Sequence, residues 1–95
     1  MLQIQHLIDG RAVESGSGRT GPVFNPATGE QTGQVDLASA AEVDSVVASS
    51  RAAFAEWKNV SIARRTKLLY AFRNLVVDNA DEIARRLTAE HGKVA

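Results

Sequence analysis

Residues 16–21 have the G-x-G-x-x-G spacing with which some proteins bind the pyrophosphate of a dinucleotide. That chemistry requires a helix to begin at the last glycine, because backbone N–H groups and the helix dipole meet the phosphates there. Pro22 and Pro26 follow closely, with the extended pair Val23-Phe24 between them, so no helix is expected at this point. We therefore interpret the glycine-rich stretch as a turn.

The two histidines, His6 and His91, lie at opposite ends of the sequence, and the chain contains no cysteine. A zinc site or a thiolate nucleophile is therefore not expected. Glu90 beside His91 could support acid–base chemistry, but a histidine in the last turn of a helix also interacts favourably with the helix dipole. We favour the dipole, and no spacing indicates a Ser-His-Asp triad.

Basic side chains are concentrated in the second half of the sequence, at Arg64, Arg65, Lys67, Arg73 and the pair Arg85-Arg86. On a helical surface they could form a face that binds a phosphate or a coenzyme. Acidic residues are interspersed with them, and charges of both signs on the outer faces of amphipathic helices usually keep a domain soluble. We prefer this second interpretation.

The overall charge favours neither nucleic acid nor a membrane as a partner. The 95 residues include 11 Lys plus Arg and 11 Asp plus Glu, with 44% hydrophobic side chains and a pI near 6.7. Proteins that bind phosphate backbones carry an excess of basic residues. No stretch approaches the roughly 20 apolar residues of a membrane helix, and no targeting leader is evident. We expect one globular unit, located in the cytoplasm.

Residues 1–38 are predicted to form short strands and turns, because they contain six of the seven glycines and both prolines. Asp9-Gly10 is typical of a type I′ hairpin turn. Residues 15–18 are expected to be a flexible loop, and residues 25–30 a turn. The predicted strands are 6–8, 11–14, 23–24 and 31–36.

Residues 39–95 are predicted to form three helices, because apolar side chains recur there at spacings of three and four. Ser39 and Glu42 form a capping box for the first helix, which places Phe54 and Trp57 on a core-facing stripe. Ser61 is expected to cap the second helix. Asn79 and Glu82 suggest a capping box for the third, and Gly92 is expected to end it. Strands followed by three helices give an α+β chain.

Several motifs occur in a fixed order along the whole chain. They are Leu7-Ile8-Asp9-Gly10, Ser15-Gly16-Ser17-Gly18-Arg19, Asn25-Pro26-Ala27-Thr28-Gly29-Glu30, Glu42-Val43-Asp44, Ala53-Phe54-Ala55-Glu56-Trp57, Arg64, Arg73 and Glu90-His91-Gly92-Lys93. In this combination they resemble the aldehyde dehydrogenase superfamily. The Glu-His-Gly-Lys ending and the Ser-Gly-Ser-Gly-Arg loop are most similar to the methylmalonate-semialdehyde dehydrogenase branch, which forms an acyl-coenzyme A product.

The resemblance implies an NAD-dependent oxidation of methylmalonate or malonate semialdehyde. A cysteine thiolate attacks the aldehyde, hydride passes to nicotinamide, and coenzyme A releases propionyl- or acetyl-CoA. In the family the cysteine and the main cofactor-binding elements lie well beyond the position of Ala95. Residues 1–95 would then be an amino-terminal portion of the α/β NAD-binding domain. We expect this scaffold to hold no catalytic, cofactor-binding or metal-binding residue and to bind no cofactor by itself.

By the same resemblance, the loop at the end of the chain approaches the substrate side. Glu90, His91 and Lys93 are therefore the only candidate site residues. The expected partners are the remainder of the polypeptide and further copies in a homodimer or homotetramer. The alternative is a small adaptor domain that folds alone and binds a protein through its helices. An adaptor should seal its apolar helix faces against its own strands, whereas a scaffold segment should leave them uncovered.

Overall fold

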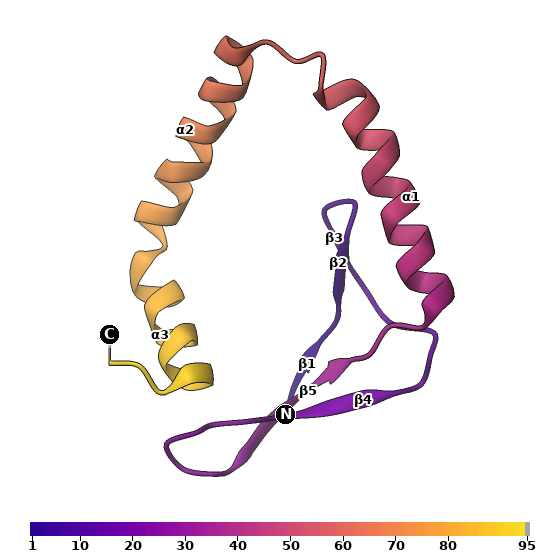
Figure 1. Cartoon of the computed structure of the whole chain (residues 1–95). Coiled ribbons are helices and arrows are strands. Elements are labelled where there is room, and N and C mark those ends of the chain that lie inside the picture. Colours follow the sequence, from indigo (N-terminus) through magenta and orange to yellow (C-terminus); the bar gives the residue numbers. More distant parts are fainter. Residues whose placement is uncertain (95) are drawn as a thin grey trace.

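Five short strands precede three helices in the computed structural model, which describes residues 1–94 (Figure 1). The strands are β1 (Leu2–Ile4), β2 (His6–Ile8), β3 (Arg11–Val13), β4 (Thr20–Phe24) and β5 (Gln31–Asp36). The helices are α1 (Ala40–Trp57), α2 (Ile62–Asp78) and α3 (Ala80–His91). This order confirms the predicted α+β class. None of the described helices has the length and apolar character needed to cross a membrane.

The strands form two separate units. β5 is the central strand of a three-stranded sheet, parallel to β1 on one side and antiparallel to β4 on the other. β2 and β3 form an antiparallel hairpin in which His6 pairs with Val13. Asp9 and Gly10 have φ angles of 52° and 74°, which confirms the predicted turn with positive φ at both positions.

β1 was not predicted, and β4 is longer than predicted. β1 forms by parallel pairing with β5, with Leu2 opposite Gly33, and such long-range pairing leaves no local signal. A β-carbon at Gly33 would lie 2.7 Å from the carbonyl oxygen of Leu2, so only glycine allows this close approach. β4 includes Gly21 and Pro22, which is tolerated because β4 lies at the edge of the sheet.

The first two helices begin where their caps predict. The Ser39 hydroxyl accepts a hydrogen bond from the Glu42 N–H at 3.1 Å, and the Glu42 carboxylate accepts one from the Ser39 N–H at 3.0 Å. These two bonds form the predicted capping box of α1. The Ser61 hydroxyl accepts from the Arg64 N–H at 3.2 Å at the start of α2. Each cap satisfies an N–H group that has no partner inside its helix.

The predicted capping box of α3 is wrong, although its predicted end is correct. The Asn79 side chain makes no cap bond and instead donates from Nδ2 to the carbonyl of Leu75 at 2.8 Å. Asn79 ends α2 and begins α3 without a spacer, so its amide serves the carbonyl end of the preceding helix. Gly92 adopts a left-handed conformation with φ 79°, and its N–H bonds the carbonyl of Thr88, as expected for a helix end.

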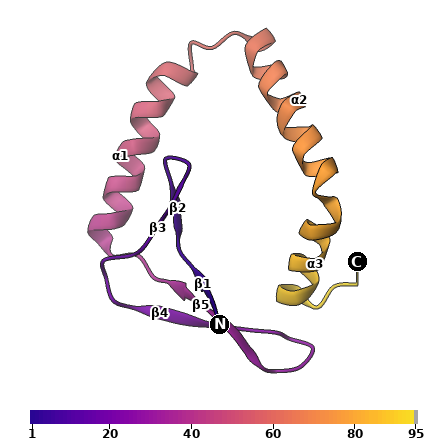
Figure 2. The ribbon, with the colours of Figure 1, turned by 180° about the vertical axis from the view of Figure 1, so that it is seen from behind.

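The helices are splayed instead of packed into a core. Figures 1 and 2 show α1 and α2 diverging from their connector at residues 58–61, with α3 continuing beyond α2. The radius of gyration is 17.0 Å, whereas a compact chain of this length has about 12 Å. No hydrophobic side chain among the described residues is buried. The prediction that Phe54 and Trp57 pack in a core is therefore wrong for this chain, because Phe54 is 59% exposed and Trp57, which lies against the Arg65 guanidinium, is 38% exposed.

Candidate functional site

The candidate residues Glu90, His91 and Lys93 lie at the carboxyl end of α3, and all three are exposed. Glu90 borders a small hollow of about 160 Å³, whose other lining residues come from α3 and from all three strands of the β1–β5–β4 sheet. His91 occupies the last turn of the helix, where the dipole explanation placed it. The structure thus gives the three residues a common location but no mutual contact that would make a catalytic group.

The end of α3 is close to the predicted turn at residues 25–30. A β-carbon at Gly92 would lie 3.3 Å from Cγ of Pro26. The Thr88 hydroxyl donates to the Lys93 carbonyl at 2.6 Å, which turns the chain back after the helix. Two of the motifs that carried the family resemblance, far apart in sequence, are therefore neighbours in space.

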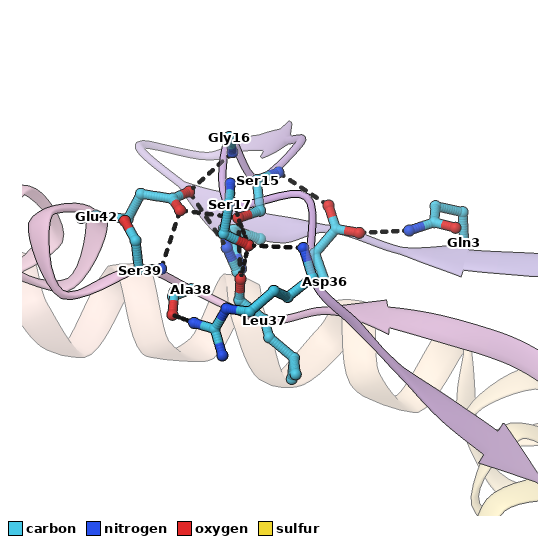
Figure 3. Close-up of polar contacts among 11 residues, drawn as sticks. Gln3, Ser15, Gly16, Ser17, Asp36, Leu37, Ala38, Ser39 and Glu42 are labelled. Carbon is cyan, nitrogen blue, oxygen red and sulfur yellow. Dashed lines mark hydrogen bonds and ion pairs between the residues drawn. The ribbon is translucent and has the colours of Figure 1, made fainter.

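A second polar cluster surrounds the serine loop, residues 15–18 (Figure 3). The Ser15 hydroxyl donates to the Glu42 carboxylate at 2.8 Å. The Ser17 hydroxyl donates to the carbonyl of Leu37 at 2.5 Å. The Gly16 N–H also points to Glu42, at 3.4 Å. Hydrogen bonds thus hold the loop against the start of α1, which corrects the expectation of a flexible stretch.

Asp36 anchors the other side of the serine loop. It is only 7% exposed and is the one buried polar or charged residue described. Its carboxylate accepts hydrogen bonds from the Ser15 N–H at 2.9 Å and from the Gln3 side-chain amide (Figure 3). Because Gln3 lies in β1 and Asp36 ends β5, this carboxylate ties the loop to the sheet. The sequence analysis did not predict this role of Asp36, since Gln3 and Ser15 are both distant from it in sequence.

Glu42 is held in its ionised form. The hydrogen bond from the Ser39 backbone N–H, followed by that from the Ser15 hydroxyl, lowers the pKa of Glu42 from 4.5 to about 2. Only half of this arrangement was predicted, namely the capping box with Ser39. The bond from Ser15 depends on the folded loop. Glu42 therefore joins the helix cap to the serine loop through one carboxylate.

His6 completes the polar cluster but does not make it a catalytic triad. Its Nε2 lies 3.7 Å from Glu42 Oε2, is buried, and has no hydrogen-bond partner among the described residues. In a Ser-His-acid triad the imidazole stands between the hydroxyl and the carboxylate. Here the Glu42 carboxylate stands between Ser15 and His6, so no imidazole is in contact with the serine hydroxyl.

The glycine-rich stretch at residues 16–21 does not fit a dinucleotide. It leads into β4, not into a helix, as predicted. The N–H groups of Ser17 and Arg19 donate to hydroxyls within the loop, and that of Gly16 faces the Glu42 carboxylate. A pyrophosphate would meet an anion there in place of free N–H donors. Within residues 1–94 no three His, Asp or Glu side chains gather as a metal site would require.

Comparison with known proteins identifies relatives along almost the whole chain. The model of the aldehyde dehydrogenase family matches residues 12–95. Malonate-semialdehyde dehydrogenase 3 of Geobacillus kaustophilus is 43% identical over 91 residues, which are 96% of this chain and 19% of that protein. Malonate-semialdehyde dehydrogenase 2 of Geobacillus thermodenitrificans is 41% identical, again over 91 residues that are 96% of this chain and 19% of that protein.

Solved structures give the same result. A Sinorhizobium meliloti protein described as a methylmalonate-semialdehyde dehydrogenase, in complex with NAD, matches with a TM-score of 0.91 and 42% identity. Methylmalonate-semialdehyde dehydrogenase of Oceanimonas doudoroffii matches with a TM-score of 0.89 and 40% identity. Each match covers 96% of this chain and 18% of the solved chain, so the fold corresponds to their amino-terminal part. The chain belongs to the aldehyde dehydrogenase family.

Proposed function

We propose that this chain is the amino-terminal scaffold of an NAD-dependent, coenzyme A-acylating aldehyde dehydrogenase. Its substrates would be methylmalonate or malonate semialdehyde, and its products propionyl- or acetyl-CoA. The names of the relatives support the substrate class, and the complex of one similar structure with NAD supports the cofactor. The catalytic cysteine and the sites for both coenzymes would come from polypeptide outside these 95 residues, which contain no cysteine.

The uncovered apolar faces of the helices carry this proposal. The accessible surface of the described chain is 7786 Å², against about 5,300 Å² for a compact protein of the same mass. On α2, Leu69 and Phe72 are 58% and 61% exposed. Such faces are covered in a stable protein by other polypeptide. They favour a segment that packs against the rest of a larger domain over an adaptor whose strands seal its helices.

The proposal also covers the candidate residues and the partners. Glu90, His91 and Lys93 are exposed at the end of α3, where further polypeptide could place them at the substrate side. The partners would be the remainder of the domain and further copies of the whole enzyme in a homodimer or homotetramer. We keep the cytoplasm as the proposed location. We propose neither nucleic acid nor a membrane as a partner, because the numbers of acidic and basic residues are equal.

An activity assay with a chimaera tests the proposal. The chimaera joins this chain to the remaining part of the Geobacillus kaustophilus relative, and the matched control is that remaining part alone. With methylmalonate or malonate semialdehyde and NAD, we expect coenzyme A-dependent NADH formation by the chimaera only. This chain alone should form none. NADH formation by the isolated chain, or a folded chimaera inactive on both semialdehydes, would contradict the proposal.

A further inference from the structure

The turn between β4 and β5, residues 25–30, is held in shape by its own hydrogen bonds. The Asn25 N–H donates to the Glu30 carbonyl at 2.9 Å, and the Gly29 N–H donates to the Asn25 carbonyl at 2.8 Å. The Asn25 side-chain oxygen also accepts a hydrogen bond from the Ala27 N–H at 2.9 Å. Both ends of the turn continue into paired strands. The conformation of the turn is therefore set by residues of this chain alone.

Pro26 in this turn lies against the carboxyl end of α3, which Figures 1 and 2 show beside the connection of β4 and β5. Gly92 has a φ angle of 79°, and a β-carbon added to it would lie 3.3 Å from Cγ of Pro26. Glycine is thus favoured at position 92 for two separate reasons, namely the left-handed backbone that ends the helix and the space that the proline ring occupies. The ring is itself fixed, because its nitrogen belongs to the backbone of the turn.

The strands give α3 little other support. Within residues 1–94, no recorded hydrogen bond or ion pair joins a side chain of α3 to a strand, and the recorded ones stay within the helix and the loop after it. A hollow of about 160 Å³, lined by side chains of both elements, lies between α3 and the sheet. The sheet therefore leaves space beside the helix, whereas Pro26 and Gly92 leave little room for even one added carbon.

We propose that Pro26 is a positioning residue for the loop that contains Glu90, His91 and Lys93. The hydrogen-bonded turn is a fixed support, and the missing side chain of Gly92 lets the loop lie directly on the proline ring. This inference rests on the proposed function, which puts the loop at the substrate side. A shifted loop should weaken binding of the semialdehyde. It should leave NAD binding and the chemical step unchanged, because the groups for those steps would come from other polypeptide.

An NMR measurement on the full chain tests the contact itself. We expect a nuclear Overhauser effect between the ring hydrogens of Pro26 and the α-hydrogens of Gly92. In Gly92→Ala the new methyl group meets Cγ of Pro26, so the loop must shift, and the effect to the α-hydrogen should fall at least about twofold. Absence of the effect in the parent chain would overturn the proposal.

Kinetics of the chimaera described above test the positioning role. Gly92→Ala should raise the KM for the semialdehyde at least about threefold, with kcat and the KM for NAD unchanged. Pro26→Ala removes Cγ and should raise the same KM about twofold, and Gly92→Ala should raise it no further in that background. Gly18→Ala is the matched control, because Gly18 also has a positive φ of 71° but an added carbon there meets nothing within 4 Å. It should leave the KM unchanged.

The outcomes separate this inference from the proposed function. A folded chimaera that is inactive on both semialdehydes contradicts the proposed function. An active chimaera in which Gly92→Ala leaves the KM for the semialdehyde unchanged, or changes it as much as Gly18→Ala does, overturns the role of Pro26 alone. An equal rise of this KM by Gly92→Ala in the Pro26→Ala background would also overturn that role, since no ring remains there to displace the loop. Circular dichroism checks that all variants keep their helices.

Discussion

The strands and the helices of this chain differ in what holds them in place. A buried carboxylate, Asp36, and the hydrogen-bonded serine loop tie β1, β5 and the start of α1 together. Beyond the start of α1, the helices meet the strand region only at isolated points, such as the hydrogen bond from Ser49 to Asp9 and the approach of Gly92 to Pro26, and their apolar faces are uncovered. The difference indicates that the strand region is specified by contacts within the chain, whereas the helices depend on contacts with polypeptide outside it.

Removal of the buried carboxylate of Asp36 should cause the largest loss of stability in the strand region. Asp36→Ala leaves the Ser15 N–H and the Gln3 amide without their acceptor, and the expected loss is about 2–3 kcal/mol of unfolding free energy. Urea unfolding followed by circular dichroism measures the loss. Asp44→Asn, an exposed change on α1, is the control. An unchanged midpoint in Asp36→Ala would show that the polar contacts do not stabilise the strand region.

A side chain at Gly33 should have the next largest effect. The β-carbon of Gly33→Ala would lie 2.7 Å from the Leu2 carbonyl oxygen, so β1 must move away from β5. We expect a cost of about 1–3 kcal/mol. Hydrogen exchange should show faster exchange of β1 amides in the variant. Gly16→Ala, where the added carbon meets nothing within 4 Å, should leave β1 unchanged. Equal exchange rates of the β1 amides in both variants would refute the close approach of Gly33 to Leu2.

The hydrogen bonds of the Glu42 carboxylate should make the stability of the chain depend on pH. The pKa of Glu42 is lowered from 4.5 to about 2, so its contribution is complete above about pH 4.5 and is lost as pH falls towards 2. Glu42→Gln should be less stable at pH 7 and should lose less stability over this range than the parent. Thermal unfolding across the range measures both effects. Glu56→Gln, on the same helix, should retain the parent's pH dependence.

Truncation of an apolar side chain on α2 should have the smallest effect on stability. Leu69 is 58% exposed, so Leu69→Ala should cost less than about 1 kcal/mol, whereas the same change in a buried core costs about 2–5 kcal/mol. Self-association should respond instead, because exposed apolar faces drive contacts between copies. Sedimentation of the parent and of Leu69→Glu tests this. A parent chain that stays monomeric at high concentration would contradict the claim that its apolar helix faces are uncovered.

The sequence predicted the helices well because their signals are local. The capping box of Ser39 and Glu42, the Ser61 cap and the Gly92 end all lie within a few residues of the helix ends that they define. Asn79 was misjudged because it also ends the preceding helix. Its single amide went to that helix's carbonyl and not to the start of α3.

Long-range contacts limited the prediction elsewhere. The parallel pairing of β1, the burial of Asp36 and the fixed serine loop each join residues that are far apart in sequence. The core prediction for Phe54 and Trp57 was wrong for a different reason. The apolar stripe was recognised correctly, but periodicity indicates only that a face should be covered, not that the same 95 residues cover it.

Hydrogen exchange of α2 in two contexts tests the central claim most directly. The isolated chain is compared with the chimaera that joins it to the remaining part of the Geobacillus kaustophilus relative. We predict that the amides of α2 exchange at least about tenfold more slowly in the chimaera, while the Ser15 amide, bonded to Asp36 in both, changes little. Equal protection of α2 in the two proteins would contradict the claim that its apolar face requires further polypeptide.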